Sequence, residues 1–289
     1  MKITNKLNLP ETFANFYDNS EDKGIIQNRY SVTELLKPIQ EIILFRTNYD
    51  KIKRDLTDLV PAIFGSAVHY ILEKNTKPSE TLLSEYKFET DILGKIVVGK
   101  CDLLDLEKLE IIDYKTSSVS KVKIGNFDDY YKQDMIYAYM TYLKFGVKIK
   151  RLKNYILMKD WSKLKLYKIS DYPTSPIHIW EYEVQDSDFD YIEKWLKQRI
   201  RDIDAGIVNC SEEETWYSGN KFAVYKNKGD IRAKKVFDSL TEAELYKVEN
   251  KFEYIEMRKG ENTKCLYYCD CKEFCEQYRK ELENGKEQI

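Results

Sequence analysis

Between residues 86 and 115, apolar residues recur at every second position, a pattern with which an extended strand buries one of its faces. The stretches 62–75, 128–145 and 187–204 instead space their apolar residues as amphipathic helices do. We expect residues 151–169 to form a strand, a turn near residue 161 and a second strand. The chain is therefore predicted to combine neighbouring strands with several helices in an α/β fold.

The length of 289 residues allows one large domain, or one domain with a smaller appendage. A net charge of −2 gives no overall attraction to nucleic acid or to an anionic membrane, so any such surface must be local. No apolar stretch approaches the roughly 18–20 residues of a membrane span. Residues 1–19 lack the basic and apolar segments of a signal peptide. We expect a cytoplasmic protein, either bacterial or encoded by a phage and acting in the host cytoplasm.

Three regions are predicted along the chain. Residues 1–28 are polar and irregular and are expected to form an N-terminal arm. Residues 29–205 form the main domain, whose first helix begins with a capping box of the Ser-x-x-Glu type at Ser31 and Glu34. Residues 206–289 are rich in cysteine and form a C-terminal subdomain, in which Ser239 and Glu242 repeat the capping box.

The segment IIDYKTSS, residues 111–118, places an acid and a lysine on the same face of a strand, at Asp113 and Lys115. If the preceding turn centres on residues 107–108, Asp102 lies opposite Asp113, with Cβ atoms about 5 Å apart. Such carboxylates repel each other unless one is protonated or a cation lies between them, and Mg²⁺ and Mn²⁺ prefer oxygen ligands. Lys115 beside that ion would suit metal-assisted phosphodiester hydrolysis. The alternative is an exposed hairpin with weak surface ion pairs.

Two helices add polar side chains. Gly65, His69 and Glu73 share one stripe, and the small Gly65 is expected to let that stripe approach another backbone closely. His69 could be a third metal ligand and Glu73 a further acid, or His69 could be a partly buried, hydrogen-bonded core histidine. Gln133 and Tyr137 also share a face, where the alternative is a core aromatic beside a solvated amide.

In this order the motifs resemble the PD-(D/E)XK nuclease superfamily, and within it the RecB-type exonuclease branch that includes CRISPR-associated RecB-like nucleases and many phage enzymes. The resemblance covers residues 30–145 and rests on four motifs, which are Gly65/His69/Glu73, Gly99/Asp102, Asp113/Lys115 and Gln133/Tyr137. It implies a restriction-endonuclease-like α/β fold with a mixed central sheet flanked by helices.

The resemblance also implies roles for these residues. His69, Asp102 and Asp113 would bind Mg²⁺ or Mn²⁺, together with the backbone carbonyl of Tyr114. Lys115 would orient the attacking water or stabilise the pentacovalent phosphorane. The remaining pair, Gln133 and Tyr137, would position DNA or Lys115.

Four cysteines lie close together near the C-terminus, which in a cytoplasmic protein suggests thiolate ligation of a metal. RecB-like relatives often carry a [4Fe-4S] cluster bound by one distant cysteine and three near the C-terminus. The resemblance therefore implies a structural [4Fe-4S] cluster, with Zn²⁺ as the main alternative and reduced core thiols as a weaker one. Its ligands would be Cys210, Cys265, Cys269 and Cys275, and Cys271 would be a spare or alternative ligand. In the CRISPR-associated members the distant cysteine lies in the first helix; that region has no cysteine here, and Cys210 is the best replacement.

Residues 121–170 contain twelve Lys or Arg and four Asp, a local charge of +8. Basic groups neutralise phosphates, and aromatic rings can stack on unpaired bases. The alternative is a solvated charged face. The interleaved aromatic residues are Tyr130, Tyr131, Tyr155, Trp161 and Tyr167.

The sequence thus predicts a metal-dependent deoxyribonuclease, with an exonuclease favoured. Its substrate would be single-stranded DNA or DNA ends, in phage-type recombination, replication or DNA processing. A partner protein from recombination or replication is compatible with this prediction. Two alternatives stay open: an endonuclease for flapped or branched DNA, and a non-catalytic DNA-end-binding subunit with the same fold.

Overall fold

The computed structural model describes residues 1–18, 24–206 and 208–286. The chain divides into two compact units, Met1–Ile207 and Val208–Ile289, and each is described by itself. None of the helices in these described ranges combines the length and the apolar character that a bilayer crossing requires.

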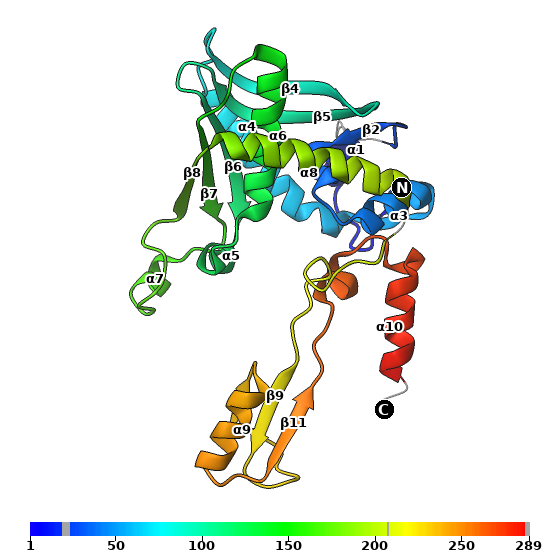
Figure 1. The fold of residues 1–289 in the computed structure, drawn as a ribbon, viewed down its shortest axis with the longest axis vertical. Helices are drawn as coiled ribbons and strands as arrows, with labels where there is room; N and C mark the ends of the chain where they lie inside the picture. The colour runs from blue at the N-terminus through cyan, green and yellow to red at the C-terminus, as the bar shows by residue number, and fades with distance from the viewer. Residues whose placement is uncertain (19–23, 207, 287–289) are drawn as a thin grey trace. The chain divides into compact units, whose positions relative to one another are not determined.

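A six-stranded mixed sheet forms the centre of the first unit (Figure 1). Its central strand β5 pairs along its length with β4, while β2 and β6 share the other edge of β5. The pairs β2–β5 and β6–β7 are parallel, and the other pairs are antiparallel. The predicted mixed central sheet is confirmed, and its strands are β2 (Arg29–Ser31), β4 (Leu82–Ile92), β5 (Lys95–Asp105), β6 (Glu110–Ser117), β7 (Arg151–Met158) and β8 (Ile177–Glu183).

Helices flank this sheet, as predicted. The helices α6 and α8 pack against each other, α6 contacts β4, β6 and β7, and α4 contacts β6. The apolar faces of α6 and α8 contribute fully buried residues such as Ile136 and Ile192 to the same core as Leu152 of β7. The helices of the first unit are α1 (Glu11–Asp18), α2 (Val32–Leu35), α3 (Ile39–Asn48), α4 (Val60–Asn75), α5 (Val119–Ile124), α6 (Asp128–Phe145), α7 (Lys163–Leu166) and α8 (Asp186–Ala205), with 3₁₀ turns at Tyr49–Lys51 and Leu56–Leu59.

The start of the main domain follows its sequence signals. Ser31 Oγ accepts the backbone N–H of Glu34 at 3.1 Å, and Glu34 Oε2 accepts that of Ser31 at 3.4 Å, so the predicted capping box forms. Pro38 separates α2 from α3. Within the predicted arm, residues 1–28, the structure has α1 and a strand β1 (Lys2–Thr4) that pairs with β3 (Lys53–Asp55); residues 19–23 lie outside the described residues.

One sequence expectation is wrong: the second strand expected before residue 169 is absent among the described residues there. The chain instead forms a lobe with the short helix α7, and β8 begins only at Ile177. Trp161 anchors this lobe through a hydrogen bond from Nε1 to the carbonyl of Pro173, at 2.8 Å. A small apolar cluster of Val119, Met158 and Tyr172 packs the lobe against α5, which helical or strand periodicity alone does not reveal.

The second unit contains a three-stranded antiparallel sheet in the order β10–β9–β11, with α9 packed on it. Ser239 precedes α9, but its side chain makes no capping hydrogen bond with any described residue, so the second predicted capping box is wrong. The elements of this unit are β9 (Lys221–Tyr225), β10 (Lys235–Phe237), α9 (Leu240–Glu249), β11 (Tyr254–Arg258), a π-helical turn Lys264–Tyr268, a 3₁₀ turn Lys272–Phe274 and α10 (Glu276–Lys286).

Candidate active site

The hairpin of β5 and β6 has the register that the sequence predicted. Leu103 pairs with Ile112, which in an uninterrupted ladder would place Asp102 opposite Asp113. The ladder ends before that pair. The Asp102 carboxylate accepts the backbone N–H of Tyr114 instead, through Oδ2 at 2.8 Å. Asp102 is thus fixed at the point where the two strands stop pairing.

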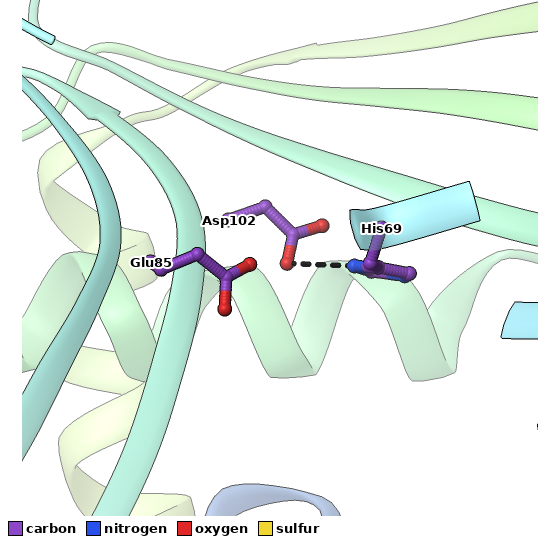
Figure 2. Close-up of side chains that lie close together, drawn as sticks. All are labelled: His69, Glu85 and Asp102. Atoms are coloured by element: carbon purple, nitrogen blue, oxygen red, sulfur yellow. Dashed lines mark hydrogen bonds and ion pairs between the residues drawn. The ribbon is translucent and has the colours of Figure 1, made fainter. Parts of the chain in front are cut away.

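Three possible metal ligands converge on this point, as Figure 2 shows. The Nδ1 atom of His69, on α4, lies 3.1 Å from Asp102 Oδ1. Glu85, on β4, directs its carboxylate toward the same place, and one ligand atom from each of the three residues lies within 4.8 Å of the others. The hydrogen bond to Asp102 raises the pKa of His69, although partial burial opposes this effect. One imidazole nitrogen and two carboxylates form a donor set that suits Mn²⁺ or Mg²⁺.

Sequence reasoning missed Glu85. In the register of β4 with β5, Ser84 pairs with Leu103 and Tyr86 with Cys101, so Glu85 stands opposite Asp102. The turn at Gly94 could have revealed Glu85 in the sequence, because a β4–β5 hairpin that turns there has this register. Glu85 itself has a φ of +52°, an uncommon backbone conformation for a residue other than glycine.

The predicted pair of Asp113 and Lys115 forms a buried ion pair. Lys115 Nζ lies 2.7 Å from Asp113 Oδ2 and donates a hydrogen bond of 2.9 Å to Gln133 Oε1, on α6. Asp113 does not belong to the group of His69, Glu85 and Asp102. In the described residues its negative charge is balanced by Lys115.

The acidic side chains around Lys115 favour its charged form. Burial favours the neutral amine, but the carboxylates of Asp113 and Asp102 outweigh it and raise the pKa of Lys115. Burial likewise raises the pKa of Asp113, against the opposing effect of Lys115. Lys115 is therefore a permanent cation at neutral pH, held inside the protein by the acids around it.

The ring of Tyr137 packs directly against the backbone of Gly99. A Cβ atom added to Gly99 would lie 2.5 Å from Tyr137 Cε1 and 2.8 Å from Val32 Cγ2, closer than real contacts allow. The absence of a side chain at Gly99 therefore lets α6 lie close to β5. From there the Tyr137 hydroxyl accepts a hydrogen bond of 3.4 Å from Gln133 Nε2, and Tyr137 supports Gln133 rather than facing solvent.

A second buried acid lies behind Lys115, and the sequence did not single it out. Asp134 is fully buried and accepts a hydrogen bond from Asn154 Nδ2 on β7. Burial raises the pKa of Asp134 well above its usual range, with the Asp113 charge adding to the effect. Oδ1 of Asp134 and Oδ1 of Asn154 both lack a partner among the described residues. A proton on Asp134 would supply the donor that this pair lacks.

Glu73 and Gly65 lie at the edge of this arrangement. Together with His69, Glu85 and Lys100 they line a surface cavity of about 480 Å³. Glu73 is exposed, so it lies at the cavity wall and not in the buried network. The expected close backbone approach at Gly65 is wrong, because a Cβ there would meet only Thr116 Oγ1, at an ordinary 3.8 Å.

Five of the six cysteines lie in the second unit, and Cys101 belongs to the core of the first. Burial raises the pKa of Cys210 to about 12 and that of Cys265 to about 11. Gln277 ties Cys210 to α10, because it accepts the Cys210 N–H at 2.9 Å and donates to its carbonyl at 3.0 Å. In the described ranges the cysteine sulfurs do not form a group as tight as that of His69, Glu85 and Asp102.

The aromatic residues of the basic stretch have different environments. Tyr131 donates a hydrogen bond of 2.9 Å to Asp188, Trp161 anchors the α7 lobe, and the ring of Tyr155 packs against that of Tyr114. Tyr130 lies beneath the Lys115 and Lys121 ammonium groups, at 5.4 and 5.2 Å. Tyr167, with 77% of its surface exposed, is the member of this set that is free to stack on a base.

The first unit is thus an α/β domain with a mixed central sheet, and its hairpin of β5 and β6 carries Asp113 and Lys115 two residues apart. Residues 58–216 match the family model of the PD-(D/E)XK nuclease superfamily. The chain belongs to this superfamily, as its motifs suggested. PD-(D/E)XK nucleases act on DNA and use divalent metal ions, and the ligand group around Asp102 accords with this.

Several solved structures are similar to the chain, with low sequence identity and low TM-scores. A crystal structure of SSO0001 shares 18% identity over 66% of this chain and 82% of its own, with a TM-score of 0.42. A phage-related exonuclease from Haemophilus somnus 129PT shares 11% identity over 61% of this chain and 94% of its own, with a TM-score of 0.39. An alkaline exonuclease, LHK-Exo, from Laribacter hongkongensis shares 13% identity over 62% of this chain and 89% of its own, with a TM-score of 0.35. No curated protein sequence matches the chain significantly.

Proposed function

We propose that this protein is a metal-dependent deoxyribonuclease of the RecB-like branch that degrades DNA from its ends. The observation that carries the proposal is the position of Lys115, a buried cation between Asp113 and Gln133 beside the ligand group of His69, Glu85 and Asp102. A purely structural ion pair needs no imidazole and no further carboxylates converging next to it.

Mg²⁺ or Mn²⁺ would be held by His69, Asp102 and Glu85, with Asp113 and the carbonyl of Tyr114 as further ligands. The residues fit such an ion because three of them already direct ligand atoms to one place. A bound divalent ion would supply Lewis-acid activation of the phosphate and of the attacking water.

The chain's own residues account for the rest of the site. Lys115 would place a fixed positive charge beside the scissile phosphate, where negative charge develops in the transition state. Gln133 accepts a hydrogen bond from the Lys115 ammonium through Oε1 and donates one to Asp113 through Nε2, and the Tyr137 hydroxyl supports Gln133. Glu73, at the cavity wall, would be a further acid close to the incoming strand.

The α7 lobe supports a preference for single strands. It carries the exposed lysines Lys159, Lys163, Lys165 and Lys168 around the exposed ring of Tyr167. The lobe packs on α5, which follows the strand of Lys115 directly, so the lobe and the site belong to the same unit. Proteins commonly bind unpaired strands with lysines that neutralise the phosphates and with an aromatic ring that stacks on the bases.

The cysteines would hold a structural [4Fe-4S] cluster through Cys210, Cys265, Cys269 and Cys275, in the second unit. Thiol donors suit iron–sulfur clusters and Zn²⁺ alike. Gln277 ties Cys210 to α10, whose first residue follows Cys275 directly in the chain. Anaerobic purification distinguishes the two metals, since a cluster gives visible absorbance and bound iron, whereas Zn²⁺ gives a colourless protein.

Digestion of labelled linear and circular single-stranded DNA, with Mg²⁺ or Mn²⁺, tests the proposal. We expect the linear strand to be degraded to short products and the circle to resist. Cleavage of the circle at an equal rate would indicate an endonuclease. Tight binding of DNA ends without cleavage at any metal concentration would indicate a non-catalytic end-binding subunit.

A further inference from the structure

The sheet of the second unit is carried on a short stem. The N–H of Ser218 donates to the carbonyl of Glu261, and the N–H of Lys264 to that of Thr215, both at 3.0 Å. From the stem β9 leads outward and β11 returns beside it, with α9 packed on the sheet (Figure 1). Residues 226–235, the loop between β9 and β10 together with the first residue of β10, therefore lie at the end of the sheet away from the stem. We call this segment the basic loop.

The basic loop has an unusual charge for this chain. It contains five basic residues and one acid, a net charge of +4, whereas the whole chain carries −2. All five basic side chains are exposed, and none forms an ion pair with a described residue. They are Lys226, Lys228, Arg232, Lys234 and Lys235.

The single acid of the loop does not neutralise them. Asp230 accepts hydrogen bonds from Asn227, at 3.2 Å from the backbone N–H and 3.5 Å from the side-chain amide. The Glu253 carboxylate accepts the backbone N–H of Lys228 at 3.4 Å, and the ammonium and guanidinium groups of the loop form no ion pair with a described residue.

Two of the five basic side chains contact aromatic rings of the same unit. Lys235 Nζ lies 4.8 Å from the ring centre of Phe237 and 5.2 Å from that of Tyr246, and Lys228 Nζ lies 6.0 Å from that of Tyr254. Such contacts orient an exposed ammonium group but do not remove its charge. They leave both lysines able to meet a phosphate.

An apolar residue stands between these charges. Ile231 is 96% exposed, beside Arg232 and one residue after Asp230. The loop is nevertheless held at both ends, because Lys234 N–H donates to Val224 O at 2.7 Å and Glu253 N–H to Lys226 O at 2.9 Å. An isoleucine that a fixed backbone presents to solvent among cations has no stabilising role in the fold of this unit.

We propose that the basic loop binds the phosphate backbone of duplex DNA, with Ile231 inserted into a groove. Basic side chains combined with an apolar wedge are a common way to grip duplex DNA without reading its sequence. Unpaired strands are less suitable, because the loop contains no aromatic residue on which bases could stack. The inference rests on the proposed function in one respect, that DNA is the substrate.

Binding measurements on the full chain without added metal test this inference. In one variant Lys226, Lys228, Arg232 and Lys234 are all changed to Gln, and a second variant carries Ile231→Ala. A matched control neutralises three exposed lysines of the first unit, Lys6, Lys51 and Lys53. Fluorescence anisotropy gives the affinity for a blunt duplex and for a single strand of equal length, over a range of salt concentrations.

We expect the fourfold Gln variant to bind the duplex about 10- to 100-fold more weakly, with the salt dependence reduced by about 0.9 for each phosphate that is no longer neutralised. Ile231→Ala should weaken duplex binding without changing the salt dependence. The control should bind as the unmodified protein does. Unchanged duplex affinity in the fourfold variant, or an equal loss for the single strand, would overturn the inference.

The outcome is independent of hydrolysis. If the fourfold variant loses duplex binding while the protein cleaves no DNA under any metal, the basic loop is confirmed and the proposed nuclease activity fails. If the protein cleaves DNA and the variant binds the duplex normally, the activity holds and the loop inference fails. Cleavage of a short single strand should be unchanged in the variant.

Discussion

The ammonium group of Lys115 donates a hydrogen bond to the side-chain oxygen of Gln133, over 2.9 Å. Asp113 contacts the same ammonium at 2.7 Å, so two residues from different elements fix its place. Gln133 itself does not carry charge. We infer that it is a positioning residue, which acts on the reaction through Lys115.

Replacement of Gln133 by Ala should therefore lower kcat and leave KM for DNA nearly unchanged. A misplaced Lys115 stabilises the transition state less well, and we expect the rate to fall about 10- to 100-fold. Steady-state kinetics on a linear strand measures both constants. The exposed Gln198, replaced by Ala, is the matched control, and a rise in KM with normal kcat would assign Gln133 to DNA binding instead.

Glu85 gives a prediction about metal affinity. The Glu85→Gln variant keeps the shape of the side chain but removes one charged ligand beside His69 and Asp102. We expect the Mn²⁺ concentration for half-maximal activity to rise about 10- to 100-fold. Glu89→Gln, on the same strand but exposed and paired with Arg29, should leave it unchanged. An identical metal requirement in both variants would exclude Glu85 from the site.

Asp134 gives a prediction about pH. Its pKa in the folded protein lies well above 3.8, so the folded state keeps a proton that the unfolded state releases as the pH rises past that value. The unmodified protein should lose stability relative to Asp134→Asn by about 1.4 kcal/mol per pH unit between the two pKa values. Urea unfolding at a series of pH values measures this difference. A difference that is constant from pH 4 to pH 7 would show that Asp134 is ionised in the fold.

Tyr167 gives a prediction about strand preference. Its exposed ring should stack on an unpaired base, a contact worth about 1–3 kcal/mol. Tyr167→Ala should therefore weaken single-strand binding about 5- to 150-fold and leave duplex binding nearly unchanged. Tyr267, 68% exposed in the second unit, is the matched control for removal of an exposed ring. Equal binding of single strands by both variants would remove Tyr167 from the interface.

Much of the first unit could be predicted because it follows local rules. The helix from residue 128 to residue 145, the strand from 151 to 158 and the capping box of Ser31 all form as their patterns indicate. The same holds for the register of β5 with β6, which one turn determines. These features depend on neighbours in sequence, and periodicity reports such neighbours well.

The failures have a common physical origin. Glu85 enters the site through the register of a different hairpin, and Asp134 through burial against Asn154, and both are tertiary relationships. The α7 lobe replaced an expected strand because its apolar residues pack on α5 and not on a neighbouring strand. The Ser239 side chain caps no described residue although its spacing to Glu242 is suitable, so such spacing alone does not ensure a capping box.

The central claim is that Lys115 and Asp113 perform metal-dependent hydrolysis, and digestion of a labelled linear strand by Lys115→Ala and Asp113→Asn tests it most directly. Removal of the buried cation leaves Asp113 unpaired, so Lys115→Met combined with Asp113→Asn provides a variant without an uncompensated charge. Lys108→Ala, at the exposed turn of the same hairpin, is the control. Melting temperatures identify any variant that does not fold.

We predict that folded variants at Lys115 and Asp113 lose at least about 100- to 1,000-fold in rate, whereas Lys108→Ala retains full metal-dependent activity. If the folded variants at Lys115 and Asp113 digest the strand as fast as the control does, the assignment of this site is contradicted.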